Sequence, residues 1–89
     1  MSVQPAPTVD IYLTQWCPYC ARARTLLRAK GASVREIDIE SAPDLRAEMI
    51  QRSGRSSVPQ IFIGTTHVGG CDDLQALDER GKLDSLLRS

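Results

Sequence analysis

Two cysteines separated by two residues, Cys17 and Cys20, stand between a predicted strand and a predicted helix. Apolar and polar side chains alternate over residues 9–14, which indicates the strand, and residues 21–30 indicate the helix. A thiol in the first turn of a helix meets unpaired backbone N–H groups and the positive end of the helix dipole. Both favour the thiolate, which is the nucleophile in disulfide exchange. Because Pro18 also suits a helix start, the motif predicts a redox site at a strand-to-helix junction.

The rest of the pattern predicts further strands and helices in a definite order. Apolar periodicity indicates a strand, a helix, two strands joined by a tight turn, a helix and a short last helix. These elements are centred on residues 37–39, 45–49, 61–63, 67–68, 74–77 and 83–87. The order βαβαββα plus a short C-terminal helix implies a right-handed parallel crossover followed by an antiparallel hairpin. It predicts an α/β, thioredoxin-like fold with a four-stranded mixed sheet flanked by helices on both faces.

The 89 residues suit one small domain, expected at residues 8–89 after a flexible N-terminal lead-in at residues 1–7. Three cysteines are too few for a secreted disulfide framework, and the N-terminus lacks the pattern of a signal peptide. No stretch approaches the roughly 20 apolar residues of a membrane span. The net charge of zero argues against a nucleic-acid partner. We expect a cytoplasmic protein with no membrane contact, in which paired cysteines are catalytic or metal-binding.

A second motif, Ser57-Val58-Pro59, directly precedes the apolar strand. Proline cannot donate to a strand ladder, so it belongs at the start of the strand. Although only about 5–6% of X–Pro bonds are cis, a Cys-x-x-Cys in this order of elements favours a cis bond before Pro59. The backbone N–H and C=O of Val58 would then face a peptide-like substrate.

A third motif is Gly69-Gly70-Cys71-Asp72-Asp73. Its glycines let the backbone turn sharply and approach a ligand, and the following helix start is either capped by an aspartate or a site for a carboxylate. Cys71 is interpreted as a small buried hydrophobe and His67 as structural or exposed. We expect Trp16 to be a packing residue, the alternative being that it lines the approach to the cysteines. Tyr19 is expected to be exposed, where it can stack on a substrate.

Basic residues dominate the segment after Cys20, which has no acid before Glu36: Arg22, Arg24, Arg28, Lys30 and Arg35. They are either solvated helix faces or a positive rim beside the thiol, favouring the thiolate and an anionic substrate.

With these three motifs in this order, the chain resembles the glutaredoxins of the dithiol Cys-Pro-Tyr-Cys class, and in particular the bacterial glutaredoxin 3 group. The resemblance covers nearly everything after Pro7. It implies a glutathione-dependent thiol-disulfide oxidoreductase, with glutathione as reductant and co-substrate. The implied partners are disulfide-containing or glutathionylated proteins, ribonucleotide reductase among the candidates, and a monomer is expected.

Carried over to this chain, the resemblance makes Cys17 the nucleophile and Cys20 the resolving thiol. Arg46 resembles the position that pairs with the glycine carboxylate of glutathione. The residues expected to bind glutathione are Cys17, Tyr19, Arg46, Ser57, Val58, Pro59, Gly70, Cys71, Asp72 and Asp73. The chain departs from the family at Thr14, where members usually carry a lysine that supports the thiolate and the glutathione carboxylate.

Other interpretations of the cysteines stay open at this point. Cys17, Cys20, His67 and Cys71 are four candidate ligands for a zinc-binding module. A glutathione-ligated iron–sulfur cluster carrier is another, and a redoxin fed by thioredoxin reductase is a third. Pro18 argues against zinc because it suits a helix start, and against the cluster carrier because cluster-binding relatives tend to differ there. We therefore expect no metal ligands.

Overall fold

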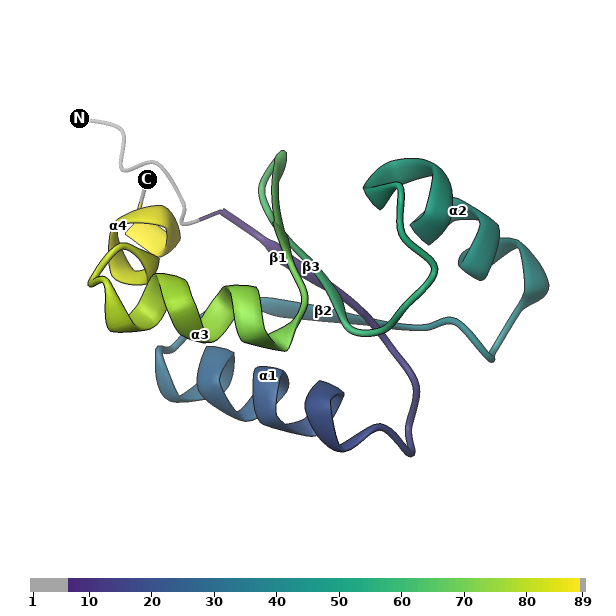
Figure 1. Cartoon of the computed structure of the whole chain (residues 1–89), viewed down its shortest axis with the longest axis horizontal. Helices are drawn as coiled ribbons and strands as arrows, with labels where there is room; N and C mark the ends of the chain where they lie inside the picture. The colour runs from purple at the N-terminus through teal and green to yellow at the C-terminus, as the bar shows by residue number, and fades with distance from the viewer. Residues whose placement is uncertain (1–6, 89) are drawn as a thin grey trace.

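The computed structural model describes residues 7–88, so most of the expected lead-in lies outside the described residues. The predicted order of strands and helices is confirmed (Figure 1). Among the described residues, no helix has the length and apolar character needed to cross a membrane. The elements are β1 (Val9–Leu13), α1 (Pro18–Ala29), β2 (Val34–Asp38), α2 (Pro43–Ser53), β3 (Gln60–Ile63), β4 (Thr66–Gly69), α3 (Cys71–Glu79) and α4 (Leu83–Arg88).

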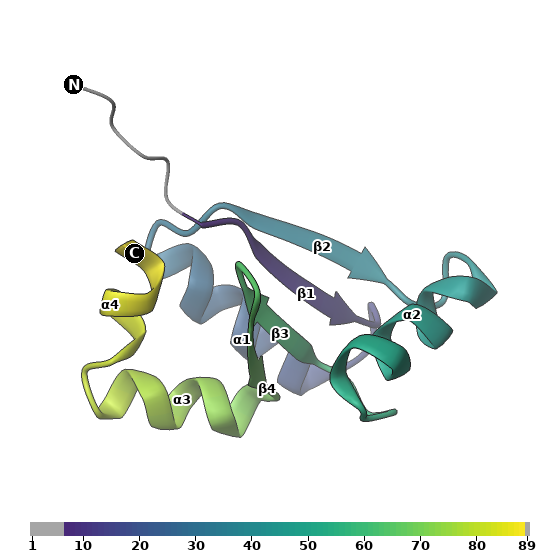
Figure 2. The ribbon, with the colours of Figure 1, turned by 90° about the horizontal axis from the view of Figure 1, so that it is seen from above.

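The four strands form one mixed sheet in the order β2-β1-β3-β4. Strand β1 pairs parallel to β2 and antiparallel to β3, and β4 pairs antiparallel to β3. Helices α1, α3 and α4 lie on one side of the sheet and α2 on the other (Figures 1 and 2). The prediction of a mixed sheet with helices on both faces is therefore confirmed.

Strand β1 is buried on both faces, although its alternating sequence is typical of a strand with one exposed face. Val9, Ile11 and Leu13 pack into the larger core under α1, α3 and α4. Tyr12 packs in a smaller core on the α2 side with Ile39, Met49 and Phe62. The alternation in β1 thus separates two cores.

Asp10 is the charged residue of β1, and it is buried on the α2 side of the sheet. Arg35 of β2 donates two hydrogen bonds of 3.1 Å to its carboxylate, and Arg52 of α2 donates a third at 2.9 Å. Burial alone would raise the pKa of Asp10, but the hydrogen bonds from Arg52 and Arg35 outweigh it and hold this pKa below the usual carboxyl range. The ion pairs therefore join α2 to the two strands beneath it.

The pairing of β3 with β4 contains a bulge beside Ile61. Ile61 lies opposite Gly69 but Phe62 lies opposite His67, so Val68 is the extra residue on β4. On the turn side of the bulge, Gly64-Thr65 sets the register that pairs Phe62 with His67. His67 therefore lies on the α2 side, where its ring stacks on Phe62 with centroids 4.7 Å apart.

Gly69 ends β4 in a conformation that requires glycine. Its φ is +116°, and a Cβ added there would lie 2.3 Å from Oδ2 of Asp73. The sharp turn expected from the paired glycines is therefore located at this position.

We expect Arg52→Met to lower the free energy of unfolding by about 2–3 kcal/mol, because it leaves a buried carboxylate with one partner. It also removes a guanidinium that lies 4.0 Å from the centroid of the Phe62 ring. Arg35→Met is the matched control, since that side chain is 64% exposed against 33% for Arg52, and it should cost less than about 1 kcal/mol. Urea unfolding measures both. Equal losses of unfolding free energy in the two variants would contradict the expectation that the less exposed arginine contributes more.

Candidate active site

Cys17 caps helix α1. Its Sγ accepts a hydrogen bond of 3.3 Å from the backbone N–H of Cys20, and the chain at Cys17 is extended. The helix therefore begins at Pro18, three residues before the predicted start, because the sulfur takes the position of an N-cap oxygen and proline occupies the first helical position. A negative charge on this sulfur would be stabilised by the N–H and by the helix dipole. Cys17 is half-buried, so a substrate can reach it.

Cys20 has the opposite environment, with only 2% of the residue exposed. Burial is the main cause that raises the pKa of Cys20 to about 12, and its proximity to Cys17 acts in the same direction. At neutral pH the side chain is therefore a protonated thiol. Such a thiol is a poor first attacker, but it lies one helical turn from Cys17 and can attack a disulfide formed there.

A groove of about 250 Å³ lies beside this helix start. It is formed by segments from α1, the loop before β3, β3 itself and the start of α3. Its lining residues are Tyr19, Arg55, Ser57, Val58, Pro59, Gln60, Gly70, Cys71, Asp72 and Asp73. Eight of the residues expected from the sequence thus lie together, whereas Arg46 is exposed on α2 and does not line the groove.

The Val58–Pro59 peptide bond is cis, as predicted. Pro59 is buried at the entry to β3, while Ser57 is exposed and Val58 is half-buried. The predicted second motif therefore forms one wall of the groove.

The start of α3 forms the opposite wall. Oδ2 of Asp73 accepts a hydrogen bond of 2.9 Å from the backbone N–H of Gly70, which is the aspartate cap considered from the sequence. The hydrogen bond from Gly70, followed by that from Arg55, lowers the pKa of the Asp73 carboxyl group. The protein's own carboxylate thus occupies part of the anion site that a helix start offers.

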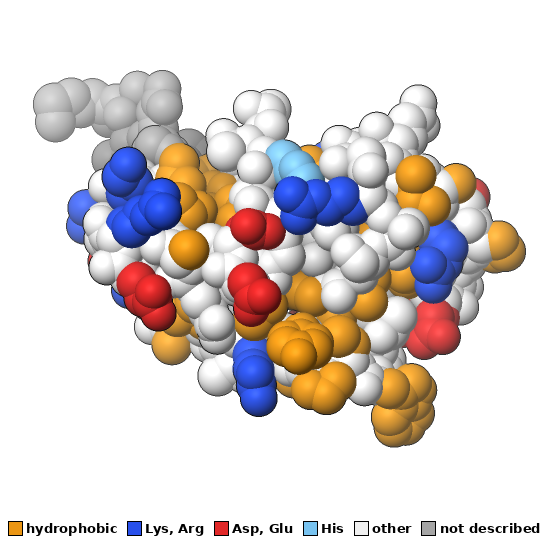
Figure 3. Space-filling view, in the orientation of Figure 1, with side chains coloured by type: hydrophobic (Ala, Val, Ile, Leu, Met, Phe, Trp, Pro, Cys, Tyr) orange, Lys and Arg blue, Asp and Glu red, His pale blue; other side chains and the backbone are white. Residues whose placement is uncertain are grey.

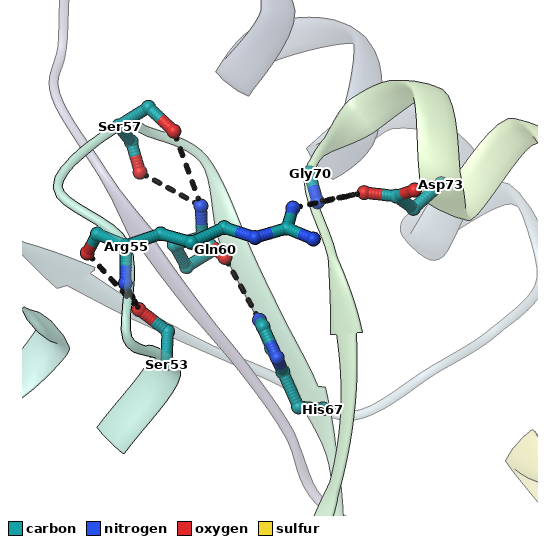
Figure 4. Close-up of polar contacts among 7 residues, drawn as sticks. All are labelled: Ser53, Arg55, Ser57, Gln60, His67, Gly70 and Asp73. Carbon is teal, nitrogen blue, oxygen red and sulfur yellow. Dashed lines mark hydrogen bonds and ion pairs between the residues drawn. The ribbon is translucent and has the colours of Figure 1, made fainter. Parts of the chain in front are cut away.

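Two lining residues, Arg55 and Gln60, were not singled out from the sequence. The guanidinium of Arg55 extends across the groove to Asp73, with Nη1 and Oδ2 3.3 Å apart (Figure 4). Gln60 is a polar residue buried at the first position of β3. A buried polar residue at the start of an apolar strand is the signal that could have identified it.

The aromatic residues near Cys17 are exposed. Trp16 is 88% exposed, so the expectation that it packs in the protein was wrong. Trp16 lies in the short loop between β1 and α1, where the rest of the described chain leaves its side chain exposed. Tyr19 is 55% exposed, as predicted, and the guanidinium carbon of Arg22 lies 5.6 Å from its ring centroid.

Most of the basic residues after Cys20 are engaged in ion pairs. Arg24 and Arg28 pair with Glu36, Lys30 with Asp78 and Asp84, and Arg35 with Asp10. Figure 3 shows basic and acidic side chains interspersed on the face it presents. The sequence offered solvated helix faces or a positive rim beside the thiol. The structure instead holds these four residues in ion pairs, and Arg22 is the one that lies beside the site.

Cys71 is buried at the groove, as expected of a small hydrophobe, and burial, followed by the neighbouring Asp72, raises the pKa of its thiol. Within residues 7–88, no three His, Cys, Asp or Glu side chains are grouped closely enough to hold a metal ion. His67 instead lies 2.8 Å from Gln60 and stacks on Phe62, which is a structural role. The four candidate zinc ligands are therefore not assembled.

A sulfur at a helix N-cap, a buried second thiol one turn further and a cis-proline loop beside them define a thioredoxin-like thiol-disulfide oxidoreductase. The glutaredoxin family model matches residues 9–68. The chain is 58% identical over 80 residues to glutaredoxin 3 of Escherichia coli, covering 90% of this chain and 96% of that protein. It belongs to the glutaredoxin family.

Solved structures agree with this assignment. The solution structure of glutaredoxin from Brucella melitensis has a TM-score of 0.85 and 59% sequence identity, covering 98% of this chain and 95% of that one. A buckwheat glutaredoxin–glutathione complex has a TM-score of 0.82 and 32% identity, covering 89% of this chain and 74% of that one. The predicted thioredoxin-like fold is thereby confirmed.

The different environments of the thiols predict selective alkylation. At neutral pH, iodoacetamide should modify Cys17 in the reduced protein while Cys20 and Cys71 react only after denaturation, because both are buried with raised pKa values. Mass spectrometry of digested protein locates the label. The Cys17→Ser variant is the control and should stay unlabelled in the native state. Rapid labelling of Cys20 in the folded protein would contradict this assignment of environments.

Proposed function

We propose that this protein is a glutathione-dependent oxidoreductase that reduces protein disulfides and glutathione mixed disulfides through Cys17 and Cys20. The observation that carries the proposal is the position of Cys17 Sγ at the N-cap of α1, beside a groove suited to a peptide. The buckwheat relative was solved as a complex with glutathione. We further propose that residues 8–89 form one glutaredoxin domain, acting as a cytoplasmic monomer.

For a mixed disulfide, the Cys17 thiolate attacks the glutathionyl sulfur, and the protein thiol leaves as a thiolate that takes a proton from water. Cys17 is then glutathionylated. A second glutathione thiolate attacks the glutathionyl sulfur, which releases glutathione disulfide and restores the Cys17 thiolate. In this route Cys20 has no part.

For a protein disulfide, the Cys17 thiolate attacks one sulfur and forms a mixed disulfide, while the substrate's other sulfur leaves as a thiolate that takes a proton from water. The buried Cys20 then attacks Cys17 Sγ and gives up its proton, which leaves with the substrate sulfur of the mixed disulfide. The Cys17–Cys20 disulfide is finally reduced by two glutathione molecules. Proximity favours this step, since Cys20 attacks a sulfur already held beside it. The Cys17 charge, one of the causes that raise the pKa of Cys20, is also absent once Cys17 is in a disulfide.

The groove would hold the tripeptide along its length. We propose that Val58 pairs with the peptide backbone, with Ser57 and Pro59 beside it and Tyr19 covering the thiol end. The start of α3 would receive a charged end of the peptide. Arg46 would have to reach the glycine carboxylate from outside the groove, so it is the least direct of the proposed contacts. The proposed binding residues at α3 are Gly70, Cys71, Asp72 and Asp73.

Two cysteine variants test the mechanism in turnover with glutathione, glutathione reductase and NADPH. Cys17→Ser should abolish all activity. Cys20→Ser should keep the turnover of a small glutathione mixed disulfide but lose the reduction of protein disulfides such as that of ribonucleotide reductase, because Cys20 acts only in intramolecular resolution. Loss of both activities in Cys20→Ser, or absorbance bands of an iron–sulfur cluster in the purified protein, would contradict the dithiol mechanism.

Thr14 offers a test of the missing lysine. Thr14→Lys should lower the KM for glutathione roughly two- to fivefold, because a cation at an accessible position contributes about 0.3–1 kcal/mol to binding a carboxylate. The gain should shrink as salt rises. Thr14→Gln, of similar length without charge, is the control. Equal KM values for both variants at low salt would show that another residue, with Arg46 and Arg22 the first to test, already supplies the charge.

A further inference from the structure

Gln60 is buried, with 1% of the residue exposed, and its side-chain amide connects β4 to the groove (Figure 4). Its Nε2 donates to the backbone carbonyl of Ser57 at 3.0 Å and lies 3.3 Å from Ser57 Oγ. Its Oε1 lies 2.8 Å from Nε2 of His67. One amide therefore links a histidine on the hairpin to the serine that precedes Val58.

The direction of this chain of hydrogen bonds follows from its last member. A backbone carbonyl can only accept, so the atom of Gln60 that faces the Ser57 carbonyl must be the amide nitrogen. Oε1 then faces His67 and must itself accept. Nε2 of His67 therefore carries a hydrogen, whether the ring is neutral or protonated. The Ser57 carbonyl thus determines both the orientation of the Gln60 amide and the tautomer of neutral His67.

The register of the β3–β4 hairpin is what makes this chain possible. Its two-residue turn, Gly64-Thr65, pairs Ile63 with Thr66 and Phe62 with His67, so His67 lies on the same face of the sheet as Phe62 and Gln60. On that face the ring of His67 stacks on Phe62. The ring of Phe62 also lies under the guanidinium of Arg52. The histidine is therefore held in place by packing, independently of its bond to Gln60.

We propose that Gln60 and His67 are positioning residues that hold Ser57 so that its hydroxyl donates to a peptide ligand in the groove. Because Gln60 Nε2 faces a lone pair of Ser57 Oγ, the hydroxyl hydrogen is directed away from Gln60. Ser57 is exposed and lines the groove. Neither Gln60 nor His67 takes part in the sulfur chemistry in this scheme, and both act through Ser57. The proposal rests on the proposed glutathione-dependent function.

Long-range ¹H–¹⁵N correlation spectra of the single histidine test the geometry without any assay of activity. Spectra can be recorded at or above neutral pH, where the ring is neutral, because burial, followed by the charge of Arg55, lowers the pKa of His67 while Asp73 acts against this. The spectrum should show the tautomer with the hydrogen on Nε2. In Gln60→Met the preference should weaken and both tautomers should be seen. The Nδ1–H tautomer in the wild type would overturn the proposal.

Kinetics test the function of the chain of hydrogen bonds. The substrate is the mixed disulfide of glutathione with 2-mercaptoethanol. Gln60→Met keeps the length of the side chain without its amide, and it should raise KM roughly fivefold, as expected for one lost hydrogen bond, with kcat within twofold of wild type. His67→Phe keeps the stack on Phe62 but lacks the donor, and should raise KM about threefold.

His67→Gln separates positioning from packing, since its amide N–H can replace the Nε2 donor. It should restore KM to within twofold of wild type. Thr66→Ala, an exposed neighbour outside the chain of hydrogen bonds, is the control and should match wild type. Equal KM values for His67→Phe and His67→Gln would overturn the proposal, and so would a fall in kcat with unchanged KM in Gln60→Met.

The two proposals fail in different ways. If the wild-type protein does not turn over the mixed disulfide, the glutathione-dependent function fails, whatever the tautomer of His67. If the wild type is active and His67→Phe has the wild-type KM, the function stands and the role of Gln60 and His67 is overturned. Thermal unfolding of each variant shows whether it is folded at the assay temperature. A positioning role requires the rise in KM to occur in a folded variant.

Discussion

The burial of β1 on both faces is the constraint on which the rest of the structure depends. Its two faces contribute to two separate cores, so the helices on opposite sides of the sheet are positioned relative to the same five residues. Asp10 adds an electrostatic requirement, because a buried carboxylate must be paired. Its partners come from β2 and α2, which joins three elements through one charge. The loop that follows α2 forms a wall of the groove, and this ion-pair network holds α2 on the sheet.

The same strand leads to Cys17, the proposed nucleophile. Four residues after β1 ends at Leu13, the chain places a sulfur where a helix offers an unpaired N–H. The second thiol of the motif enters the core, where water does not stabilise its charge. One short motif thus provides an accessible thiol and a buried one, and the difference between them is solvation and helix position rather than residue type.

The walls of the groove neutralise much of their own charge. Asp73 pairs with Arg55 across the groove and with the first amide of the α3 start, and the basic residues along α1 are largely paired with acids elsewhere. A charged peptide would therefore replace partners in these ion pairs, because the groove does not present a surface of unpaired charges of one sign. Arg55 is well placed for such an exchange. Its backbone N–H donates to Ser53 Oγ, while its guanidinium reaches Asp73 on the opposite wall of the groove.

Much of the fold and site followed from local patterns. The order of elements, the cis bond before Pro59 and the proximity of three separated motifs were predicted. The periodicity of apolar residues and the chemistry of proline act locally, and the handedness of crossovers depends on chain connectivity. The expected packing of Trp16 was wrong, since its burial depends on whether another element covers the loop, and within residues 7–88 the side chain stays exposed. The ion pairs of Arg24, Arg28 and Lys30 could not be predicted for the same kind of reason, since Glu36, Asp78 and Asp84 approach these residues only in the folded chain.

The sequence by itself determined that a thiol would cap a helix beside a proline-led strand, since the relevant forces act between neighbours in the chain. Only the tertiary structure decided what surrounds that thiol. It placed Arg55 across the groove and left Arg46 outside it. It also buried Gln60 and placed its side-chain amide 2.8 Å from His67, because burial and side-chain contacts depend on the elements packed around a residue, which no local pattern specifies.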